Sequence, residues 1–401
     1  MHSTKHALII GGGIAGPAAA LALAKAGIRA SIYEAYECSS AGVGASLTLA
    51  PNGVNALKAI GLEQAVAAIG LPVPQMVIAN GNMKALARFG TPADSQPSLV
   101  MTRSELSRVL NQAAMDAGIA IIRGKRLRAL SESRDHVRAE FDDGSSARGD
   151  MLIGADGIHS SVRLCLDPSA PAPEYAGILG FGGVAPHAVL TTTPGTMTFV
   201  FGKHGFFGYW PEPRGICWFA SLPHDVPLSN AQIRQVTNED WLARLRAFYG
   251  DDAPAQQILA QASADGLMTA GASHMMPPLP RWHSERVVLV GDAAHAPSSS
   301  SGQGASLAIE SAIELAQCLR DFDTTEQAFA RYESLRRPRV EAIAANAAKS
   351  NSQKAQGPLA RAIMHWLMPL ALKTFFNPTK RLSAQQSYRI DWDTDMRQRL
   401  R

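Results

Sequence analysis

Short apolar runs alternate with helical stretches at the start of the chain. Residues 7–10 form an apolar run that predicts a buried strand, and the alanine-rich residues 18–26 predict a helix, which Gly27 ends. Residues 29–33 predict a second strand. The order of strand, helix and strand is typical of a βαβ unit, whose two strands lie parallel in one sheet.

Two later apolar runs each lead into an aspartate. Residues 151–153 precede Asp156, and residues 287–290 lead through Gly291 into Asp292. Continuous apolar runs are typical of parallel strands buried on both faces, and the ligands of such sheets bind beyond the carboxyl ends of the strands. Asp292 is therefore placed to bind a ligand, and Asp156 stands in the same kind of position.

A serine-rich loop separates Asp292 from a long helical stretch. The loop contains Gly302 and Gly304, and from Ala305 the apolar residues recur at helical spacing as far as Leu319. The first backbone N–H groups of a helix have no partner within it, so here they would face an electron-rich ligand. Taken alone, this strand, acid and helix fit many α/β proteins.

The middle of the chain has a different pattern. Between residues 177 and 222, four short segments are rich in aromatic residues and alternate in polarity, which predicts one large sheet with an apolar face. Asn80-Gly81 predicts a hairpin, and hence antiparallel pairing. We therefore expect a mixed α/β fold with a Rossmann-like domain, a mostly antiparallel sheet domain and a C-terminal helical segment. The expected ranges are 1–72, 100–173 and 277–350 for the first, 73–99 and 174–276 for the second, and 351–401 for the third.

The last part of the chain is helical and then apolar. Residues 332–339, which include Pro338, are expected to interrupt a long helix that resumes to about Ser350. The apolar residues 363–376 are broken by Pro369 and are too short to span a bilayer. They are expected to pack on the core, with contact at a membrane interface as the alternative.

Composition narrows the class of protein. The chain has 401 residues, of which 46% are hydrophobic and 18% charged, so it can bury a large core. The net charge of +4 is small and the basic residues are scattered, which argues against nucleic-acid binding. The 4 cysteines form no CxxC pair, so neither a disulfide framework nor a metal site is expected, and a cytoplasmic location fits.

The first glycine-rich turn matches the dinucleotide-binding pattern GxGxxG. Gly11 would make the tight turn, Gly13 would let a pyrophosphate approach the backbone, and Gly16 would let the helix pack on the strand. Ile14 and Ala15 complete the turn and are expected to contact the same cofactor. The flanking strands and helix support this interpretation over a glycine turn without a nucleotide.

Three more residues are candidates for cofactor binding. Glu34 follows Gly13 by 21 positions, close to the spacing of about 20 at which an acid meets a ribose hydroxyl. Residues 42–53 are mostly small, so Ala45 and its neighbours would let the backbone approach a flat ring. Arg103 opposes the dipole of a helix that starts beside it, so it is either solvated or faces an anionic or electron-rich ligand. None of these features distinguishes NAD from FAD.

The glycine turn, Asp156-Gly157 and Gly291-Asp292, in this order, resemble the single-component class A FAD monooxygenases, which share the p-hydroxybenzoate hydroxylase fold. The resemblance runs from residue 6 to about residue 340. The chain departs from the family pattern in the serine-rich loop, where Ser299 replaces a frequent proline. Ser306 and Ser311 stand where many relatives have asparagine and aspartate.

The resemblance implies roles for the candidate residues. Glu34 would bind the adenosine ribose of FAD, and Arg103 would contact the cofactor. Asp156 would serve both FAD and the nicotinamide cofactor, and Asp292 would bind the ribityl chain. The helix that starts at Ala305 would face the pyrimidine side of the flavin ring.

The implied activity is the hydroxylation of an aromatic or polycyclic small molecule by O2 and NADH or NADPH, through a flavin C4a-hydroperoxide. Baeyer-Villiger oxidation, epoxidation and N-oxidation are alternative reactions that use the same flavin peroxide chemistry. A nicotinamide-dependent dehydrogenase and a catalytically silent flavoprotein are alternatives from other classes of protein. We expect a monomer or homodimer without stable membrane insertion.

Substrate activation would need a base, and the aromatic segments offer His187, His204 and Tyr209. Each of them also fits a purely structural role. His295 is expected to shape the loop after Asp292 rather than to react. Alternation must divide the aromatic residues of the sheet between a ligand-facing side and a core side, but the sequence does not fix which residues face which side. These residues are Phe199, Phe201, Phe206, Phe207, Trp210 and Trp218.

Overall fold

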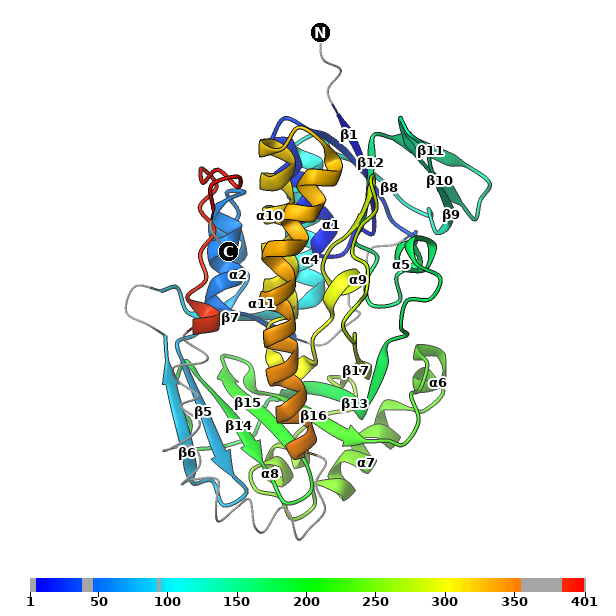
Figure 1. Ribbon diagram of the computed structural model, residues 1–401. Coiled ribbons are helices and arrows are strands. Elements are labelled where there is room, and N and C mark those ends of the chain that lie inside the picture. Colours follow the sequence, from blue (N-terminus) through cyan, green and yellow to red (C-terminus); the bar gives the residue numbers. More distant parts are fainter. Residues whose placement is uncertain (1–4, 38–45, 92–94, 355–383, 400–401) are drawn as a thin grey trace.

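Two sheets of different kinds build the protein. The computed structural model describes residues 5–37, 46–91, 95–354 and 384–399 (Figure 1). A parallel sheet with helices forms the upper part of Figure 1, and a larger, mostly antiparallel sheet forms the lower part. This arrangement confirms the mixed α/β fold with a Rossmann-like part.

The upper sheet has the strand order β18-β12-β1-β2-β8, and all its pairings are parallel. Its central strands are buried on both faces, with Leu8, Ile153 and Val288 each 0% exposed, which explains their continuous apolar runs. The strands are β1 (His6–Ile10), β2 (Arg29–Tyr33), β8 (Ala120–Ile122), β12 (Met151–Gly154) and β18 (Val287–Leu289).

Helices cover one face of this sheet, and a small antiparallel sheet covers the other (Figure 1). A Cβ on Gly149 of the small sheet would lie 2.8 Å from Leu8 Cγ, so the two sheets are in close contact. Residues 306–319 of α10 are all buried, which places that helix inside the molecule. The helices are α1 (Ala15–Lys25), α4 (Arg103–Asp116), α10 (Gly304–Asp321) and α11 (Thr325–Lys354), and the small sheet contains β9 (Leu127–Glu132), β10 (Val137–Phe141) and β11 (Ser146–Gly149).

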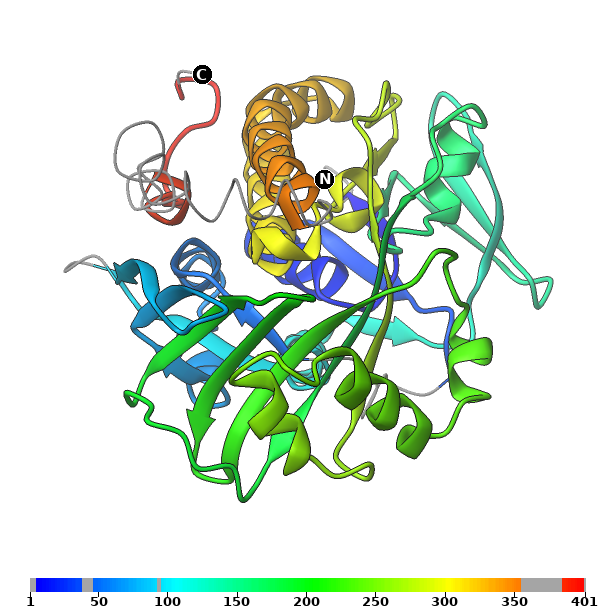
Figure 2. The same cartoon turned by 90° about the horizontal axis from the view of Figure 1, so that it is seen from below.

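The lower sheet has the strand order β17-β13-β16-β15-β14-β5-β6. The expected hairpin after Asn80 joins β5 to β6 antiparallel, while β5 and β14 pair in parallel. In Figure 2, the helices of residues 230–260 lie on the near side of this sheet, and α1 and α10 lie beyond its far side. The elements are β5 (Gln75–Asn80), β6 (Ala85–Gly90), β13 (Glu174–Ala185), β14 (Thr196–Phe201), β15 (Phe206–Glu212), β16 (Gly215–Pro223), β17 (Met268–Met275), α6 (Asn230–Arg234), α7 (Asn238–Phe248) and α8 (Ala255–Ala260).

A third, three-stranded sheet connects the two parts. Its order is β3-β7-β4, and Val73 and Val100 pack in one hydrophobic cluster with Met197, Trp210 and Cys217 of the lower sheet. One side of the lower sheet therefore faces the parallel-sheet part. The remaining elements are β3 (Ser46–Leu49), α2 (Pro51–Lys58), α3 (Glu63–Ala67), β4 (Leu71–Val73), β7 (Ser98–Thr102), α5 (Ser161–Leu166), α9 (Asp292–His295) and the 3-10 turn η1 (Ser299–Ser301).

The expected interruption around Pro338 was wrong. Helix α11 continues through Pro338. Proline removes one helical hydrogen bond, but Arg336 and Arg339 on either side of it both bind Glu310 of α10, and these contacts hold the helix against its neighbour. The apolar residues 363–376 lie outside the described part of the chain. None of the described helices is both long and apolar enough to cross a bilayer.

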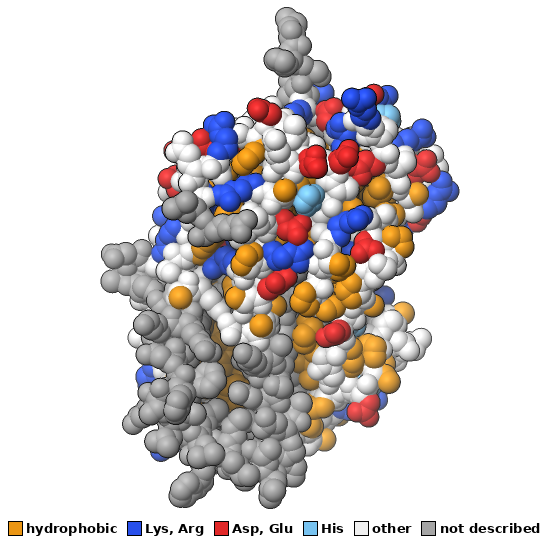
Figure 3. Space-filling model, in the orientation of Figure 1, with side chains coloured by type: hydrophobic (Ala, Val, Ile, Leu, Met, Phe, Trp, Pro, Cys, Tyr) orange, Lys and Arg blue, Asp and Glu red, His pale blue; other side chains and the backbone are white. Residues whose placement is uncertain are grey.

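Charged side chains of both signs are interspersed over the upper part of the surface in Figure 3, and hydrophobic side chains are more frequent in its lower right. This mixture agrees with the small net charge of +4. A single-sign field of the kind that attracts nucleic acid is not visible on that face.

Candidate functional site

The carboxyl ends of β1, β12 and β18 meet at one edge of the parallel sheet. Ile10 pairs with Gly154, and Gly154 pairs with Leu289. The glycine turn therefore lies beside the two segments that carry Asp156 and Asp292. Three motifs from distant parts of the sequence therefore lie at one edge of the sheet.

Gly11 and Gly16 make the turn compact. Gly11 has φ +109°, and a Cβ on it would lie 2.4 Å from the carbonyl oxygen of Ala155. A Cβ on Gly16 would lie 1.9 Å from the carbonyl oxygen of Gly11. Gly13, by contrast, has no protein atom within 4 Å of a built Cβ. The backbone at Gly13 is thus open to a ligand, while the other two glycines are fixed by packing.

Gly291 connects the two ends of the chain at this site. It has φ +63°, and a Cβ on it would lie 2.9 Å from Ala15 Cβ and 3.3 Å from Ala308 Cβ. The start of α1, which includes Ile14 as its N-cap, therefore packs against both α10 and the segment that leads into Asp292. A side chain larger than hydrogen at Gly291 would separate them.

The Asp292 carboxylate is half-buried and makes no hydrogen bond or ion pair with any described residue. Burial raises its pKa, and the guanidinium of Arg103 opposes this shift. Arg103 lies at the first position of α4, where Thr102 caps the helix by accepting from the Glu105 N–H at 3.2 Å. The Asp292 carboxylate and the Arg103 guanidinium are thus close enough to interact electrostatically, but they form no direct ion pair.

The N-terminus of α10 lies near Asp292. Ala308, which is one turn into this helix, is in contact with Gly291. Gly302 has the left-handed φ of +59°, Gln303 is the N-cap, and no side chain caps the helix. A Cβ on Gly304 would meet nothing within 4 Å. The first N–H groups of this helix, from Gly304 and Ala305 onward, are therefore available to an electron-rich ligand.

The two other acids of the site are held by backbone and hydroxyl donors. Glu34 accepts from the Gly12 N–H at 2.6 Å and from the Tyr36 N–H at 3.0 Å, so its carboxylate lies against the glycine turn. Asp156 accepts from the Ser160 hydroxyl at 2.5 Å and from the Val162 N–H at 3.1 Å. Burial raises the pKa of Asp156, and these two donors lower it.

A family model described as "FAD binding domain" matches residues 4–347. The chain belongs to this FAD-binding family. The residues described above fit FAD on three observations: the open backbone at Gly13, the carboxylate of Asp292 without a hydrogen-bond partner among the described residues, and the uncapped start of α10. Ala45, the remaining expected contact, lies outside the described residues.

Curated relatives and solved structures agree with the family. The chain is 31% identical over 352 residues to an FAD-dependent urate hydroxylase of Klebsiella pneumoniae, covering 86% of this chain and 88% of the relative. It is 30% identical over 334 residues to an aurachin C monooxygenase/isomerase of Stigmatella aurantiaca, covering 82% and 84%. The crystal structure of Klebsiella pneumoniae HpxO with FAD and uric acid is similar at a TM-score of 0.82 and 25% identity, covering 95% of this chain and 97% of that chain.

Two polar residues of α4 hold the glycine turn in place, and the sequence analysis missed both. The Ser107 hydroxyl donates to the Gly13 carbonyl at 3.2 Å, and the Asn111 amide donates to the Gly12 carbonyl at 2.8 Å. They lie four positions apart on the buried side of the helix. Polar residues at this spacing beside the apolar positions of a helix could have indicated them.

A buried polar network behind the start of α10 was also missed. The amide of Asn52 in α2 donates to Gln303 at 2.9 Å and to Glu310 at 2.7 Å. Arg336 donates to Glu310 at 2.8 Å and lies 3.2 Å from Glu314, and all three of these charged side chains are 0% exposed. Burial would raise the pKa of Glu310, but Arg336 and then Arg339 lower it below its usual value. The network connects α2, α10 and α11.

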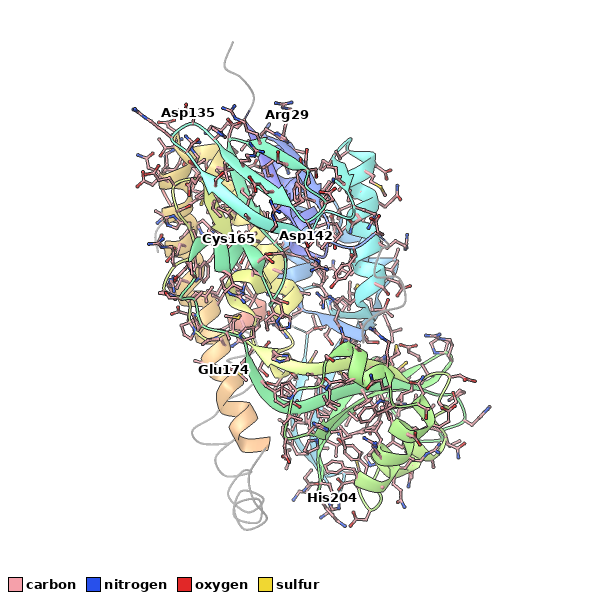
Figure 4. All side chains as sticks on the ribbon, turned by 90° about the vertical axis from the view of Figure 1, so that its right-hand side faces the viewer. Arg29, Asp135, Asp142, Cys165, Glu174 and His204 are labelled. Atoms are coloured by element: carbon pink, nitrogen blue, oxygen red, sulfur yellow. The ribbon has the colours of Figure 1, made fainter. Side chains whose placement is uncertain are left out.

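The three candidate bases lie away from this edge of the parallel sheet. His204 is on the β14–β15 turn, 2.5 Å from Asp251, and Figure 4 shows it at the far end of the lower sheet. His187 is exposed in the turn after β13. Tyr209 is buried on the side of the sheet that α6–α8 cover, in a cluster with Trp218. Their role as bases stays a prediction that these positions do not favour.

His295 is buried behind the site, where its Nε2 lies 2.9 Å from Ser311 Oγ. Burial, and then Arg336, lower its pKa to about 3. Below about pH 6.5 the imidazole of the unfolded chain therefore takes up a proton, while that of the folded chain stays neutral down to about pH 3. As the pH is lowered through this range, His295 decreases the free energy of unfolding by up to about 1.4 kcal/mol per pH unit.

We expect His295→Gln to remove this dependence. The wild-type protein should lose about 2 kcal/mol more than the variant between pH 6.5 and pH 5, measured by urea unfolding at both values. Equal losses in the two proteins would contradict the assignment of a neutral, buried imidazole.

Proposed function

We propose that this protein is an FAD-dependent monooxygenase that uses NADH or NADPH and O2 to hydroxylate an aromatic or polycyclic small molecule. The observation that carries the proposal is the junction at Gly291, where a glycine turn, an acid without a partner in the described part of the chain and an uncapped helix meet. The activities named for the urate hydroxylase and the aurachin C monooxygenase support the same reaction class.

In this proposal the upper part of the protein holds the cofactor. The turn from Gly11 to Gly16 binds the pyrophosphate, and Glu34 binds the adenosine ribose. Asp292 accepts from the ribityl hydroxyls, and Arg103 binds a phosphate or a ring oxygen. Since Asp156 lies beside the turn with both carboxylate oxygens already bound, it orients the loop at the start of α5.

The start of α10 supplies the electrostatic part of the mechanism. Its N–H groups and helix dipole carry positive partial charge, and they are fixed in position by the Asn52–Gln303 contact at 2.9 Å. They stabilise negative charge on an electron-rich ring placed against them. FAD, when bound, supplies the redox and oxygen chemistry of this family.

The lower sheet supplies a surface with little access to water. The side that faces the upper part carries Met197, Phe199, Trp210 and Phe219, which are buried or half-buried. Excluding water protects reactive intermediates from hydrolysis and strengthens the electrostatic contacts of the site. The buried free thiols of Cys217 and Cys318 suit a reducing compartment, so we place the protein in the cytoplasm.

The proposal is tested with the purified protein. We expect a yellow protein that carries FAD and whose NADH or NADPH oxidation increases when a phenol, a quinolone or a polyketide is added, with a product heavier by one oxygen atom in the mass spectrum. A protein that binds no FAD would contradict the whole proposal. A protein that binds FAD but consumes no NAD(P)H with any aromatic compound would instead be a catalytically silent flavoprotein.

Asp292→Ala should weaken FAD binding by about 10- to 100-fold, because a hydrogen bond to a charged group contributes about 1.5–3 kcal/mol. The dissociation constant is measured by flavin fluorescence after removal of the cofactor. Asp292→Asn keeps one acceptor and should lose less affinity. Unchanged affinity in the alanine variant would contradict the role assigned to this carboxylate.

A further inference from the structure

The strand register separates the two sides of the lower sheet. In antiparallel strands, directly paired residues lie on the same side of the sheet. Trp210 pairs with Cys217, and Phe199 pairs with Gly208, so these positions share the side that packs against Val73 and Val100. We call this side the inner face. The opposite side packs on α6–α8.

The inner face is almost entirely apolar. Phe199 and Phe206 stack with their centroids 5.9 Å apart, and the Phe219 ring lies against Gly208, where a Cβ would come within 2.2 Å of it. The glycine at position 208 is thus needed for the aromatic surface. The inner-face positions on β5, β13, β14, β15 and β16 are Met76, Ile78, Asn80, Ile178, Gly180, Gly182, Val184, Met197, Phe199, Phe201, Phe206, Gly208, Trp210, Glu212, Cys217, Phe219, Ser221 and Pro223.

Among these described positions there is no lysine, arginine or histidine, and the one charged residue is Glu212. Its side chain is only 17% exposed. It accepts from the Trp210 indole N–H at 3.0 Å and forms an ion pair with Arg214 at 3.5 Å, although the Arg214 side chain is 79% exposed. Burial, and then Glu212, raise the pKa of the Cys217 thiol. Glu212 therefore already has partners on its own sheet and does not need a cation from a ligand.

This distribution of charge decides which substrates the face can accept. A carboxylate moved from water onto an apolar face needs a positive partner to offset its lost hydration, and the described inner-face positions of these five strands offer none. A second negative group near Glu212 would also be repelled, more strongly than in water because the surroundings are apolar. A neutral aromatic ring meets neither obstacle and can stack on the phenylalanines.

We infer that the substrate is a neutral, hydrophobic aromatic molecule and that Glu212 acts as a specificity residue that excludes aromatic carboxylates. This inference rests on the proposed monooxygenase function and specifies its substrate class. It predicts that this protein binds neutral aromatic rings more tightly than aromatic carboxylates of the same ring system.

The test compares three ligands with one ring system: 4-hydroxyquinoline, its 2-carboxamide and its 2-carboxylate. Binding to the FAD-loaded protein is read from the change in flavin absorbance, without NAD(P)H. We expect the unsubstituted ring and the carboxamide to bind within about 5-fold of each other and the carboxylate to bind at least 100-fold more weakly. The carboxamide has nearly the shape of the carboxylate, so it separates charge from size.

Glu212→Gln keeps an acceptor for the Trp210 indole and removes the negative charge. It should improve carboxylate binding by about 10-fold and leave carboxamide binding unchanged. Equal binding of carboxylate and carboxamide to the wild-type protein would overturn the inference, as would failure of every neutral ring to bind. Ligands that bind with this preference but stimulate no NAD(P)H oxidation would contradict the proposed function and leave the charge preference standing.

Discussion

Gly16→Ala is expected to lower the stability of the protein, whereas Gly13→Ala is expected to weaken FAD binding and leave the stability nearly unchanged. At Gly16 an added Cβ would lie 1.9 Å from the Gly11 carbonyl oxygen, which is backbone and cannot move aside without shifting α1. Overpacking of this kind costs about 2–4 kcal/mol, more than the gain of about 1 kcal/mol that alanine brings to a helix. The free energy of unfolding, measured by urea on the FAD-free protein, should therefore fall by a net amount of about 1–3 kcal/mol.

At Gly13 an added Cβ meets no protein atom within 4 Å, so the FAD-free protein should keep its stability within about 1 kcal/mol. The methyl group would nevertheless occupy the space through which a pyrophosphate reaches the backbone. We therefore expect the affinity for FAD to fall by at least about 10-fold, equivalent to about 1.4 kcal/mol. Wild-type affinity for FAD in Gly13→Ala would mean that the pyrophosphate does not bind at this turn.

Arg336→Met is expected to cause the largest loss of stability in the upper part of the protein. Arg336 is 0% exposed and binds both Glu310 and Glu314, which are also 0% exposed. Removing one partner of a buried ion pair leaves an uncompensated charge and costs about 3–5 kcal/mol. Glu310 also holds Asn52, so the start of α10 should loosen and FAD binding should weaken in the same variant.

The control for Arg336→Met is Arg128→Ala. Arg128 pairs with Glu140 at 3.2 Å, but its side chain is 60% exposed, so the loss should stay below about 1 kcal/mol. Both variants are measured by urea unfolding and by titration with FAD. A loss in Arg336→Met no larger than in the control would show that the network does not support α10.

The sequence predicted which elements meet at this edge of the parallel sheet because each of them is a local pattern. The glycine turn, the apolar strands that end near Asp156 and Asp292, and the helical spacing after Gly304 each follow from a few neighbouring residues. Because parallel strands present their carboxyl ends at one edge, these parts had to meet once the strands paired. The pairing of Ile10 with Gly154 and of Gly154 with Leu289 fulfils that expectation.

The sequence could not assign the sides of the lower sheet. Alternation requires that Phe206 and Phe207 face opposite sides, but only pairing with neighbouring strands and packing on α6–α8 decide that Phe206 faces inward. For the same reason Tyr209, a candidate base by residue type, lies on the outer side. A residue's type shows what chemistry it can perform, and its register decides whether it can reach a substrate.

By itself, then, the sequence determined the elements that meet at this edge, since spacing over a few residues is enough to specify a turn, a buried strand and a helix start. Only the tertiary structure decided the buried network of Asn52, Glu310 and Arg336 and the charge of the inner face around Glu212. The network joins three different helices, and the inner face is built from several strands. Their contacts depend on how whole elements pack, which no local pattern contains.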